Sequence, residues 1–460
     1  MPKDAALDAL ASLLGERLSR SKPDLAEHGR SESHFPTTPP DAVAYPESTE
    51  EVQALVKICA EHDCPVIGWG AGTSLEGHGL AVQGGVVVDF SRMNKVIEIR
   101  LDDMDVTVQP GVTREALNEE LRATGLFFPV DPGANASLGG MAMTRASGTT
   151  TVRYGTMRDN VLGLTVVLAD GSVIRTGTRA RKSAAGFDLT ALMVGSEGTL
   201  GLITELTLKL HGQPEAVAAA TCRFDDVAAA VDCVILTIQS GIPMARIELV
   251  DEMMVRGFNL HSGTTMPEKP HLFLEFHGAP DAVREQVSSF REIASDAGAQ
   301  GWQEAETTEA RSALWSLRHG ALPAIGALDP RPGKRTYSTD VCVPISQLAE
   351  AIAAARAEAE TRALTCTIVG HVGDGNFHCG LRFDPADPAE IAEVLAFSGA
   401  LAKVALRLGG TVTGEHGIGL GKQGYMDAEH GAAVAIMRRV KTAFDPQAIL
   451  NPGKLLPPES

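Results

Sequence analysis

Apolar residues spaced as on one face of a helix lead directly into a glycine-rich stretch near the start of the chain. Ser48 and Glu51 match the residue pair of a capping box, so we expect a helix to begin there. Its apolar residues are Val52, Leu55, Val56, Cys59 and Ala60. Pro65 is expected to end this helix and to open a short strand at Val66–Ile67.

The pattern then changes to short apolar strands separated by glycines, from residue 85 to about residue 210. The predicted strands are Val86–Phe90, Val96–Ile99, Val106–Gln109, Val161–Ala169 and Leu202–Leu210. Thr113 is expected to cap a helix, and Asp170-Gly171 to form a hairpin turn. Gly212 and Pro214 indicate a domain boundary.

Helices and strands alternate from residue 214 to about residue 410. The predicted elements are helices at 226–239, 281–297 and 345–362, strands at 246–249 and 271–277, and a helix that carries Trp315. Near the end of the chain, apolar residues again recur at helical spacing. They predict one amphipathic helix from Glu429 to Phe444, with Val434, Met437 and Val440 facing inward.

Composition narrows the class of protein. The chain has 460 residues, enough for two or three domains, and a formal net charge of −18 argues against nucleic acid and anionic membrane as partners. Its seven cysteines contain no C-x-x-C pair, which argues against a disulfide framework, a zinc ribbon and an iron–sulfur cluster. No apolar run approaches the ~20 residues of a membrane-spanning helix. We therefore expect a reducing compartment and a cytoplasmic protein, with peripheral attachment to the inner membrane as an alternative.

Three clusters of glycine and small residues lie at 65–80, 134–148 and 195–201. Glycine-rich loops let successive backbone N–H groups converge on an anion, so the first cluster is a candidate pyrophosphate loop, with a surface turn as the alternative. The second cluster suits either an extended ligand or a tight packing seam. Leu75 breaks the G-x-G-x-x-G pattern, which excludes a Rossmann fingerprint. His416 and Gln423 likewise exclude a P-loop around Gly421.

A histidine pair marks a second candidate site. His371 and His378 are separated by Gly373-Asp374-Gly375, which rules out a helix and favours a strand, a turn and a second strand. This geometry brings both imidazoles together, and Glu415 follows about forty residues later. Two histidines and a carboxylate make a divalent metal site with open positions, and two hydrogen-bonded core histidines are the alternative.

The motifs resemble one enzyme family from about residue 36 to the end of the chain. They read P-V-I-G-W-G-A-G-T-S-L-E-G-H-G-L, D-P-G-A-N-A-S-L-G-G-M, V-R-Y-G-T-M-R-D-N-V-L and G-S-E-G-T-L-G-L-I-T-E. This pattern is similar to the FAD domain of the vanillyl-alcohol oxidase/p-cresol methylhydroxylase (PCMH) class. Within that class it resembles the D-lactate dehydrogenase (cytochrome) and D-2-hydroxyacid dehydrogenase family.

The resemblance implies an α+β fold: a two-subdomain PCMH-type FAD-binding domain and an α/β cap over the flavin, built as an antiparallel sheet flanked by helices. We place an N-terminal helical segment at 1–35, the FAD-binding domain at 36–213, the cap at 214–411, and a segment that returns to the FAD domain at 412–460. Asn451 and Lys454 lie in a terminal motif whose asparagine returns to the flavin in the family.

The resemblance also implies FAD-binding residues. They are Trp69, Gly70, Ala71, Gly72, Thr73, Ser74, Gly77, His78, Pro132, Gly133, Leu138, Gly139, Gly140, Thr144, Ser147, Gly148, Tyr154, Gly155, Glu197, Gly198, Gly201, Ile203 and Asn451. Relatives with covalent flavin carry a histidine at the position of Thr73, so we predict non-covalent FAD. His78 is offset from that position, and we interpret it as a polar loop residue.

The family's H-x-G-D-G-N-x-H and G-E-H-G-x-G motifs carry a metal, and both are complete here. The implied ligands are His371, His378 and Glu415, and Zn²⁺, Mn²⁺ and Fe²⁺ suit them equally. By the same resemblance, His416 is the general base, Arg318 clamps the substrate carboxylate, and Asn376 binds substrate or flavin.

The implied reaction is oxidation of D-lactate or a similar small D-2-hydroxyacid to the 2-oxoacid, with hydride transfer to flavin N5. Cytochrome c, a quinone and electron-transfer flavoprotein are the candidate acceptors. Ser338 occupies the place of a lysine in D-2-hydroxyglutarate dehydrogenases, which favours a monocarboxylate, although Lys334 and Arg335 lie near. The other candidates are D-2-hydroxyglutarate dehydrogenase, the flavin subunit of a glycolate oxidase complex and a non-catalytic flavin- or metal-binding subunit. A homodimer also stays open.

Overall fold

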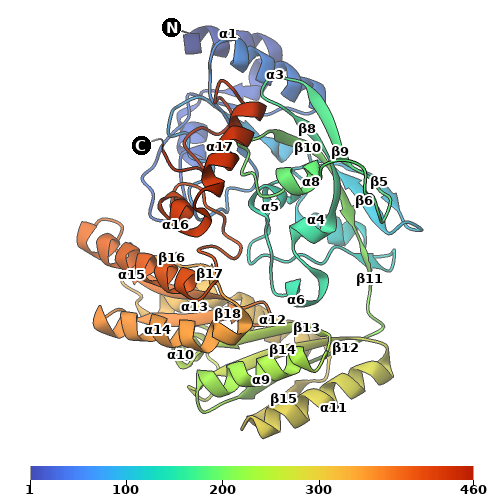
Figure 1. Ribbon diagram of the computed structural model, residues 1–460, viewed down its shortest axis with the longest axis vertical. Coiled ribbons are helices and arrows are strands. Elements are labelled where there is room, and N and C mark those ends of the chain that lie inside the picture. The colour runs from blue at the N-terminus through green and yellow to red at the C-terminus, as the bar shows by residue number, and fades with distance from the viewer. Residues whose placement is uncertain (1, 459–460) are drawn as a thin grey trace. The chain divides into compact units, whose positions relative to one another are not determined.

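The computed structural model describes residues 2–458, which form two units. Of the described residues, the first unit comprises 2–147, 155–213 and 415–458, so both ends of the described chain belong to the same unit (Figure 1). The second comprises 148–154 and 214–414. Residues 148–154 interrupt the first unit, an excursion that the sequence pattern did not indicate.

One layer of the first unit is a four-stranded sheet in the order β1-β2-β4-β3. Its strands are β1 (Leu18–Ser19), β2 (Ala42–Ala44), β3 (Val66–Trp69) and β4 (Val86–Asp89). Strands β2 and β3 run parallel to β4, and side chains such as Val66, Val86 and Val88 pack on one face against helices α1 and α3. Strand β3 therefore emerges from a packed layer directly into the glycine loop.

The other layer is a five-stranded antiparallel sheet in the order β5-β6-β10-β8-β9. Its strands are β5 (Val96–Arg100), β6 (Asp105–Val108), β8 (Val161–Val167), β9 (Val173–Gly177) and β10 (Leu202–Lys209), and β7 (Leu126–Phe127) pairs separately with β11 (His211–Gly212). The hairpin predicted at Asp170-Gly171 is confirmed as the β8–β9 connection. The predicted strands of this region are confirmed to within two residues at either end.

The first unit's helices are α1 (Pro2–Leu14), α2 (Lys22–His28), α3 (Thr49–Glu61), α4 (Arg114–Glu120), α5 (Leu138–Thr144), α7 (Met157–Asn160), α8 (Leu189–Met193), α16 (Met426–His430) and α17 (Ala433–Phe444), with short 3₁₀ turns η1 (Gly15–Arg17), η2 (Phe90–Arg92) and η4 (Gln423–Tyr425). Ser48 caps α3 by accepting from the Glu51 N–H, as predicted. The reciprocal capping-box bond is absent between these two, because the Glu51 carboxylate accepts from the Glu47 N–H and pairs with Arg17.

The last predicted helix is wrong in one respect. The chain forms α16 and α17 instead of one helix from Glu429 to Phe444, because Gly431 adopts φ 52° and interrupts the backbone hydrogen bonds. Val440 and Phe444 pack against the core of the five-stranded sheet, and Leu450 then forms an isolated bridge with Val66. Figure 1 shows this C-terminal segment in red beside β8.

The second unit is built on one antiparallel sheet in the order β15-β12-β14-β13-β18-β19-β16, with β17 also paired to β19. Its strands are β12 (Ala216–Arg223), β13 (Met244–Val250), β14 (His271–Gly278), β15 (Gln300–Ala305), β16 (Arg335–Ser338), β17 (Val341–Cys342), β18 (Cys366–His371) and β19 (Asn376–Phe383). The pairing register places side chains of neighbouring strands in common rows on each face.

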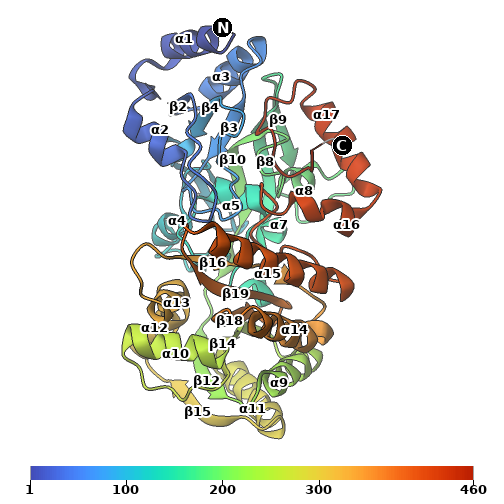
Figure 2. The same ribbon diagram turned by 90° about the vertical axis from the view of Figure 1, so that its left-hand side faces the viewer.

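Helices cover both faces of this sheet (Figure 2). They are α6 (Thr151–Tyr154), α9 (Val227–Gln239), α10 (Glu252–Ser262), α11 (Pro280–Asp296), α12 (Thr308–His319), α13 (Ala321–Leu328), α14 (Leu348–Thr361) and α15 (Pro388–Arg407), with the 3₁₀ turn η3 (Ile345–Gln347). Helices α9, α11 and α14 pack on the face of Leu272 and Leu274, and α10, α12 and α13 on the face of Phe273. The predicted α+β class and the helix-flanked antiparallel sheet are confirmed.

Candidate functional site

The first glycine cluster forms an irregular loop after β3, in the first unit. Among the described residues, the backbone N–H groups of residues 70–75 have no backbone hydrogen-bond partner. Gly72 and Gly77 adopt φ 71° and 73°, a conformation that side chains disfavour. A run of open donors in a glycine loop fits an anionic ligand such as the FAD pyrophosphate.

The three glycine clusters meet in the first unit. Gly70 lies so close to Ser137 that a Cβ would come within 2.1 Å of the serine Oγ. The N–H groups of Gly195 and Glu197 donate to carbonyls of α5, at Ala142 and Met143, over 2.9 Å each. Within the first unit, the sequence clusters at 65–80, 134–147 and 195–201 therefore pack against one another.

Two residues of the C-terminal motif, Asn451 and Lys454, bind backbone carbonyls of the first and third glycine clusters. The Asn451 amide donates to the Glu197 carbonyl at 2.7 Å and to the His78 carbonyl at 3.2 Å. Lys454 Nζ donates to the Leu80 carbonyl at 2.6 Å. Burial lowers the pKa of the Lys454 ammonium to about 8, although the Glu197 carboxylate acts in the opposite direction.

Glu197 anchors the segment that carries Glu415 and His416. Its carboxylate accepts from the N–H groups of Ile418 and Gly419 at 2.6 and 2.8 Å, and His78 Nε2 lies 3.3 Å away. Burial alone would raise the pKa of the Glu197 carboxyl, but His78 and the two backbone N–H groups hold it below its ordinary range. His78 thus lies beside Glu197, although neither of its ring nitrogens makes a hydrogen bond within the described residues.

The glycines of the G-E-H-G-x-G motif have a steric role. A Cβ on Gly417 would lie 2.7 Å from the Glu197 carboxylate, and one on Gly419 would lie 2.2 Å from the Glu76 carbonyl. The chain approaches both groups so closely that only glycine fits. Glu415 Oε2 also accepts from Ser147 Oγ at 2.7 Å, so the segment around His416 is held on both sides.

Several predicted flavin residues serve the packing of the unit. A Cβ on Gly139 would meet Pro110 at 2.5 Å, and one on Gly201 would meet Val166 at 2.4 Å. Leu138 and Ile203 are buried in the core of the five-stranded sheet. The packing seam that was the alternative for the second cluster is therefore present as well.

Two of the predicted flavin residues, Gly148 and Tyr154, belong to the second unit. The Tyr154 hydroxyl lies 2.7 Å from His277 Nδ1. The other ring nitrogen of His277 lies 2.8 Å from Glu275.

The histidine hairpin has the predicted form. Strands β18 and β19 pair with His371 opposite Asn376, and the Gly373-Asp374-Gly375 turn joins them. Paired residues share a face, and His378 is two residues beyond Asn376, so all three side chains lie on one face. The His371 and His378 rings are 5.6 Å apart between centroids and nearly perpendicular, at 84°.

Protein acceptors orient both rings. His371 Nδ1 lies 2.8 and 2.9 Å from the two carboxylate oxygens of Glu248, and His378 Nδ1 lies 2.9 Å from the Thr339 carbonyl. Because these partners only accept, each Nδ1 carries a proton, and Nε2 is the nitrogen through which either ring could bind a metal. Metal-binding histidines commonly donate their other ring N–H to a protein acceptor in this way.

Glu415 follows Gly414 directly, where the chain leaves the second unit. One ligand atom from each of His371, His378 and Glu415 lies within 4.8 Å of those of the other two. With both imidazoles in the ligand tautomer and the carboxylate oriented by Ser147, the three residues fit a divalent cation.

Arg318, on α12, shares the carboxylate that orients His371. Its Nη2 donates to Glu248 Oε2 at 2.5 Å, and both side chains are buried. The buried Arg318 Nε has no hydrogen-bond partner among the described residues. This arginine is therefore no surface cation, and one of its donors remains available for an anionic ligand.

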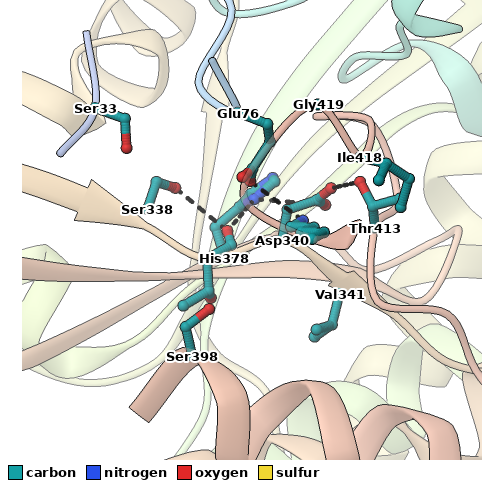
Figure 3. A network of polar contacts seen from close by, with 12 residues as sticks. Ser33, Glu76, Ser338, Asp340, Val341, His378, Ser398, Thr413, Ile418 and Gly419 are labelled. Carbon is teal, nitrogen blue, oxygen red and sulfur yellow. Dashed lines mark hydrogen bonds and ion pairs between the residues drawn. The ribbon is translucent and has the colours of Figure 1, made fainter. Parts of the chain in front are cut away.

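Asn376 is held in a single amide orientation. Its Nδ2 donates to Asp340 Oδ1 and to the Val341 carbonyl, both at 2.8 Å. The other Asp340 oxygen accepts from Thr413 at 2.7 Å, and Figure 3 shows these two side chains side by side. Both partners of Nδ2 are acceptors, so the amide cannot be flipped. Its buried Oδ1 has no partner within the described chain, so Asn376 can only accept from a ligand.

Lys334 is occupied elsewhere. Its Nζ lies 2.8 Å from Glu390 and 3.2 Å from Asp329, and only 6% of its side chain is exposed. The Ser338 hydroxyl donates back to the Thr339 carbonyl at 3.3 Å. Neither residue is therefore set up to bind a second substrate carboxylate.

Sequence reasoning missed Glu248 and Asp340, the two carboxylates behind these side chains. Glu248 lies in the strand sequence Arg-Ile-Glu-Leu-Val, and only 1% of its side chain is exposed. A charged residue within such an apolar strand is itself a signal, because an ionised carboxylate is buried only with partners.

Two protein families match the chain. The family described as FAD binding domain matches residues 40–177, and the family described as FAD linked oxidases, C-terminal domain, matches residues 213–455. The FAD-binding prediction is thus confirmed. The FAD linked oxidase domain contains the histidine hairpin and the G-E-H-G-x-G motif.

Relatives extend over nearly the whole chain. A probable mitochondrial D-lactate dehydrogenase of Danio rerio is 51% identical over 94% of this chain and 87% of its own length. The mitochondrial D-lactate dehydrogenase [cytochrome] of Arabidopsis thaliana is 44% identical over 100% and 81%. Glycolate oxidase subunit GlcD of Bacillus subtilis is 35% identical over 90% and 89%.

Solved structures share the fold at low identity. P-cresol methylhydroxylase has a TM-score of 0.81 at 19% identity, covering 98% of this chain and 96% of its own. 4-Ethylphenol oxidase from Gulosibacter chungangensis also has a TM-score of 0.81, at 21% identity, covering 99% and 98%. The predicted PCMH-type fold is confirmed.

The predicted cytoplasmic location is wrong. The Danio and Arabidopsis relatives and the D-lactate dehydrogenases of Saccharomyces cerevisiae and Kluyveromyces lactis are all named mitochondrial. Cysteine usage reports only reducing conditions, which do not identify a compartment. Among the described residues, no helix is both long and apolar enough to span a bilayer.

The chain matches a FAD binding domain followed by the C-terminal domain of FAD linked oxidases, and relatives at 38–51% identity are named D-lactate dehydrogenases. The chain belongs to the FAD-dependent D-lactate dehydrogenase family.

Proposed function

We propose that this protein oxidises D-lactate and similar small D-2-hydroxyacids to 2-oxoacids, with FAD and a divalent metal, and passes the electrons to cytochrome c or a quinone. One observation carries the proposal: Nδ1 of His371 and Nδ1 of His378 each lie 2.8–2.9 Å from a protein acceptor, which leaves Nε2 of both rings as the metal-binding nitrogen. The names of the relatives support the substrate. The metal is Zn²⁺, Mn²⁺ or Fe²⁺.

Two groups would complete the site. FAD, held by the open N–H groups of residues 70–75 and by the segments that Asn451 joins, supplies a hydride acceptor at N5. A divalent ion held by His371, His378 and Glu415 supplies a Lewis acid for the substrate oxygens. Thr73 replaces the attachment histidine of covalent relatives, so the flavin is dissociable.

The remaining roles fall to this chain's own side chains. Arg318 donates from Nε to the substrate carboxylate, a charge-assisted bond. Asn376 accepts at Oδ1 from a ligand hydroxyl or N–H group. His416 takes the proton of the substrate hydroxyl, because a neutral imidazole is an effective base near neutral pH. The contacts of its neighbours with Glu197 and Ser147 hold it in place.

A small monocarboxylate is the preferred substrate. The ion pairs of Lys334 with Glu390 and Asp329 engage one of the two cations that lie close in sequence to Ser338, the other being Arg335. A second substrate carboxylate, as in D-2-hydroxyglutarate, would be left without that partner. The identity to D-lactate dehydrogenases, at 51% and 44%, exceeds the 35% to the glycolate oxidase subunit.

Anaerobic flavin bleaching tests the proposal. The purified protein is mixed with D-lactate, L-lactate, glycolate or D-2-hydroxyglutarate, before and after dialysis against a chelator. We expect D-lactate to bleach the flavin fastest, the chelator to slow bleaching, and Zn²⁺ or Mn²⁺ to restore it. Flavin that stays yellow with D-lactate while metal is bound contradicts the proposal and favours a non-catalytic subunit.

The acceptor is tested with the same preparation. We expect cytochrome c or a soluble quinone to be reduced during D-lactate turnover, with little oxygen consumed. Turnover of the single chain with an artificial dye also separates it from a glycolate oxidase subunit, which requires iron–sulfur partners. Fast oxygen consumption, or turnover only with added subunits, contradicts the assignment.

A further inference from the structure

Two buried groups of the same composition lie on the sheet of the second unit. In one, the Glu248 carboxylate lies between His371 Nδ1, at 2.8 Å, and Arg318 Nη2, at 2.5 Å. In the other, Glu275 lies between His277 Nε2, at 2.8 Å, and Arg246 Nη1, at 3.3 Å. Both carboxylates are at least nine-tenths buried.

We propose that Glu248 is a positioning residue that prepares His371 for the metal and Arg318 for the substrate carboxylate at the same time. The inference rests on the proposed function, because it concerns the metal and substrate of that site. Glu248 contacts neither of them and acts through the other two side chains.

The first half of the argument concerns the imidazole. Both oxygens of Glu248 accept from His371 Nδ1, at 2.8 and 2.9 Å, so the proton stays on that nitrogen. The lone pair is then on Nε2, and the ring is fixed in rotation. A carboxylate behind a metal-binding histidine also raises the basicity of the ligand nitrogen, and removing such a partner typically lowers metal affinity about 10–100-fold.

The second half concerns the arginine. Oε2 of Glu248 accepts from Arg318 Nη2, which fixes the guanidinium plane and leaves Nε as an open buried donor. The positive charge of Arg318 compensates the buried negative charge of Glu248. Without the carboxylate, the guanidinium would lose its partner and its orientation.

The group around Glu275 shows that a buried carboxylate beside a histidine does not by itself make that histidine a metal ligand. His277 has a protein partner at each ring nitrogen, Tyr154 at 2.7 Å and Glu275 at 2.8 Å. His371 instead presents a ligand atom within 4.8 Å of those of His378 and Glu415. Glu275 is therefore a matched control: a buried carboxylate between histidine and arginine that serves packing.

The experiment compares Glu248→Gln, Glu275→Gln and Glu248→Asp as full-length proteins with FAD. Mn²⁺ is titrated alone, and the free ion is counted by electron paramagnetic resonance. We expect Glu248→Gln to weaken Mn²⁺ binding at least tenfold and to raise KM for D-lactate with a smaller change in kcat. Glu275→Gln should bind Mn²⁺ within about twofold of the wild type, and Glu248→Asp, which keeps the charge, should recover part of the affinity.

The outcomes separate this inference from the proposed function. A wild-type protein that binds no Mn²⁺ or Zn²⁺ overturns the metal site itself. A wild type that binds metal, with Glu248→Gln binding equally well, overturns the role of Glu248 alone. Equal losses in Glu248→Gln and Glu275→Gln also overturn it, because both then reflect general destabilisation. If Glu248→Gln does not fold, an Mn²⁺ affinity of Glu248→Asp equal to wild type, with no rise in KM, contradicts the proposal.

Discussion

Asp340 holds the Asn376 amide in one orientation by accepting from Nδ2 at 2.8 Å, and the same Nδ2 also donates to the Val341 carbonyl. Both protons of the amide are thereby used inside the protein. Toward a ligand, Asn376 can therefore only accept a hydrogen bond at Oδ1, and this direction is set by Asp340 and Val341.

Replacing Asn376 with Asp should destabilise the second unit. The change places a carboxylate against the Asp340 carboxylate and a carbonyl, with both donors lost and a like charge added. We expect the free energy of unfolding to fall by about 2–4 kcal/mol, measured by urea denaturation. Thr413→Val, which removes the donor to the other Asp340 oxygen, should cost about 1 kcal/mol. Equal stability of the two variants would argue against the assigned amide orientation.

His416→Ala should retain FAD and lose catalysis. The alanine variant keeps the contacts of Glu197 with Ile418 and Gly419, so the yellow colour should remain. Loss of a general base typically slows the reaction about 10²–10⁴-fold, measured as the rate of anaerobic bleaching by D-lactate. His430→Ala, an exposed histidine of the same returning segment, serves as the control. Bleaching of His416→Ala at the wild-type rate would show that another group takes the proton.

The flavin should be released by acid precipitation. No histidine stands at the position of Thr73, and His78 is offset from that position by five residues. We expect all yellow colour in the supernatant after treatment with trichloroacetic acid, measured by absorbance. Flavin that remains in the washed pellet would demonstrate a covalent bond at some other residue.

Asp251→Asn should stabilise the protein at alkaline pH. Asp251 caps α10, and burial raises the pKa of its carboxyl to about 7, although hydrogen bonds from the backbone act in the opposite direction. Because the folded pKa lies above the unfolded value, ionisation destabilises the fold progressively as the pH rises from about 4 to 7. Asparagine keeps the cap without the charge. The gain in unfolding free energy should be on the order of 2–4 kcal/mol at pH 8 and smaller at pH 5.

Urea denaturation of wild type and variant at these two pH values provides the measurement. Asp226→Asn supplies the control, because Asp226 caps α9 in the same way but is exposed to water. Its effect on stability should be similar at pH 5 and pH 8. A gain for Asp251→Asn that does not grow with pH would contradict the buried-charge explanation.

The histidine hairpin could be predicted because the residues between His371 and His378 allow few backbone conformations. Two glycines require a turn, and strand parity then fixes which side chains share a face. The partners of those histidines follow no such rule. Glu248 lies 123 residues from His371, and only the pairing of β13 with β18 brings the two together.

The other differences between prediction and structure also arise where a local pattern does not determine the backbone conformation or the distant contacts of a residue. The helix predicted from Glu429 to Phe444 includes residue 431, but Gly431 adopts a backbone conformation outside the helical region and divides the helix. Glu197 reaches Ile418 across 221 residues, so its role as an anchor is invisible to any local pattern. The family motifs identified the glycine clusters, whereas the packing contacts of Gly139 and Gly201 required the folded chain.

The contacts of Asn451 and Lys454 with the first glycine cluster impose an order on biosynthesis. A ribosome makes the loop at residues 69–80 more than 370 residues before the side chains that tie down its carbonyls. Until those last partners are made and docked, the carbonyls of His78 and Leu80 lack these two donors. We therefore expect a chain truncated before Asn451 to hold FAD less tightly than the full-length protein.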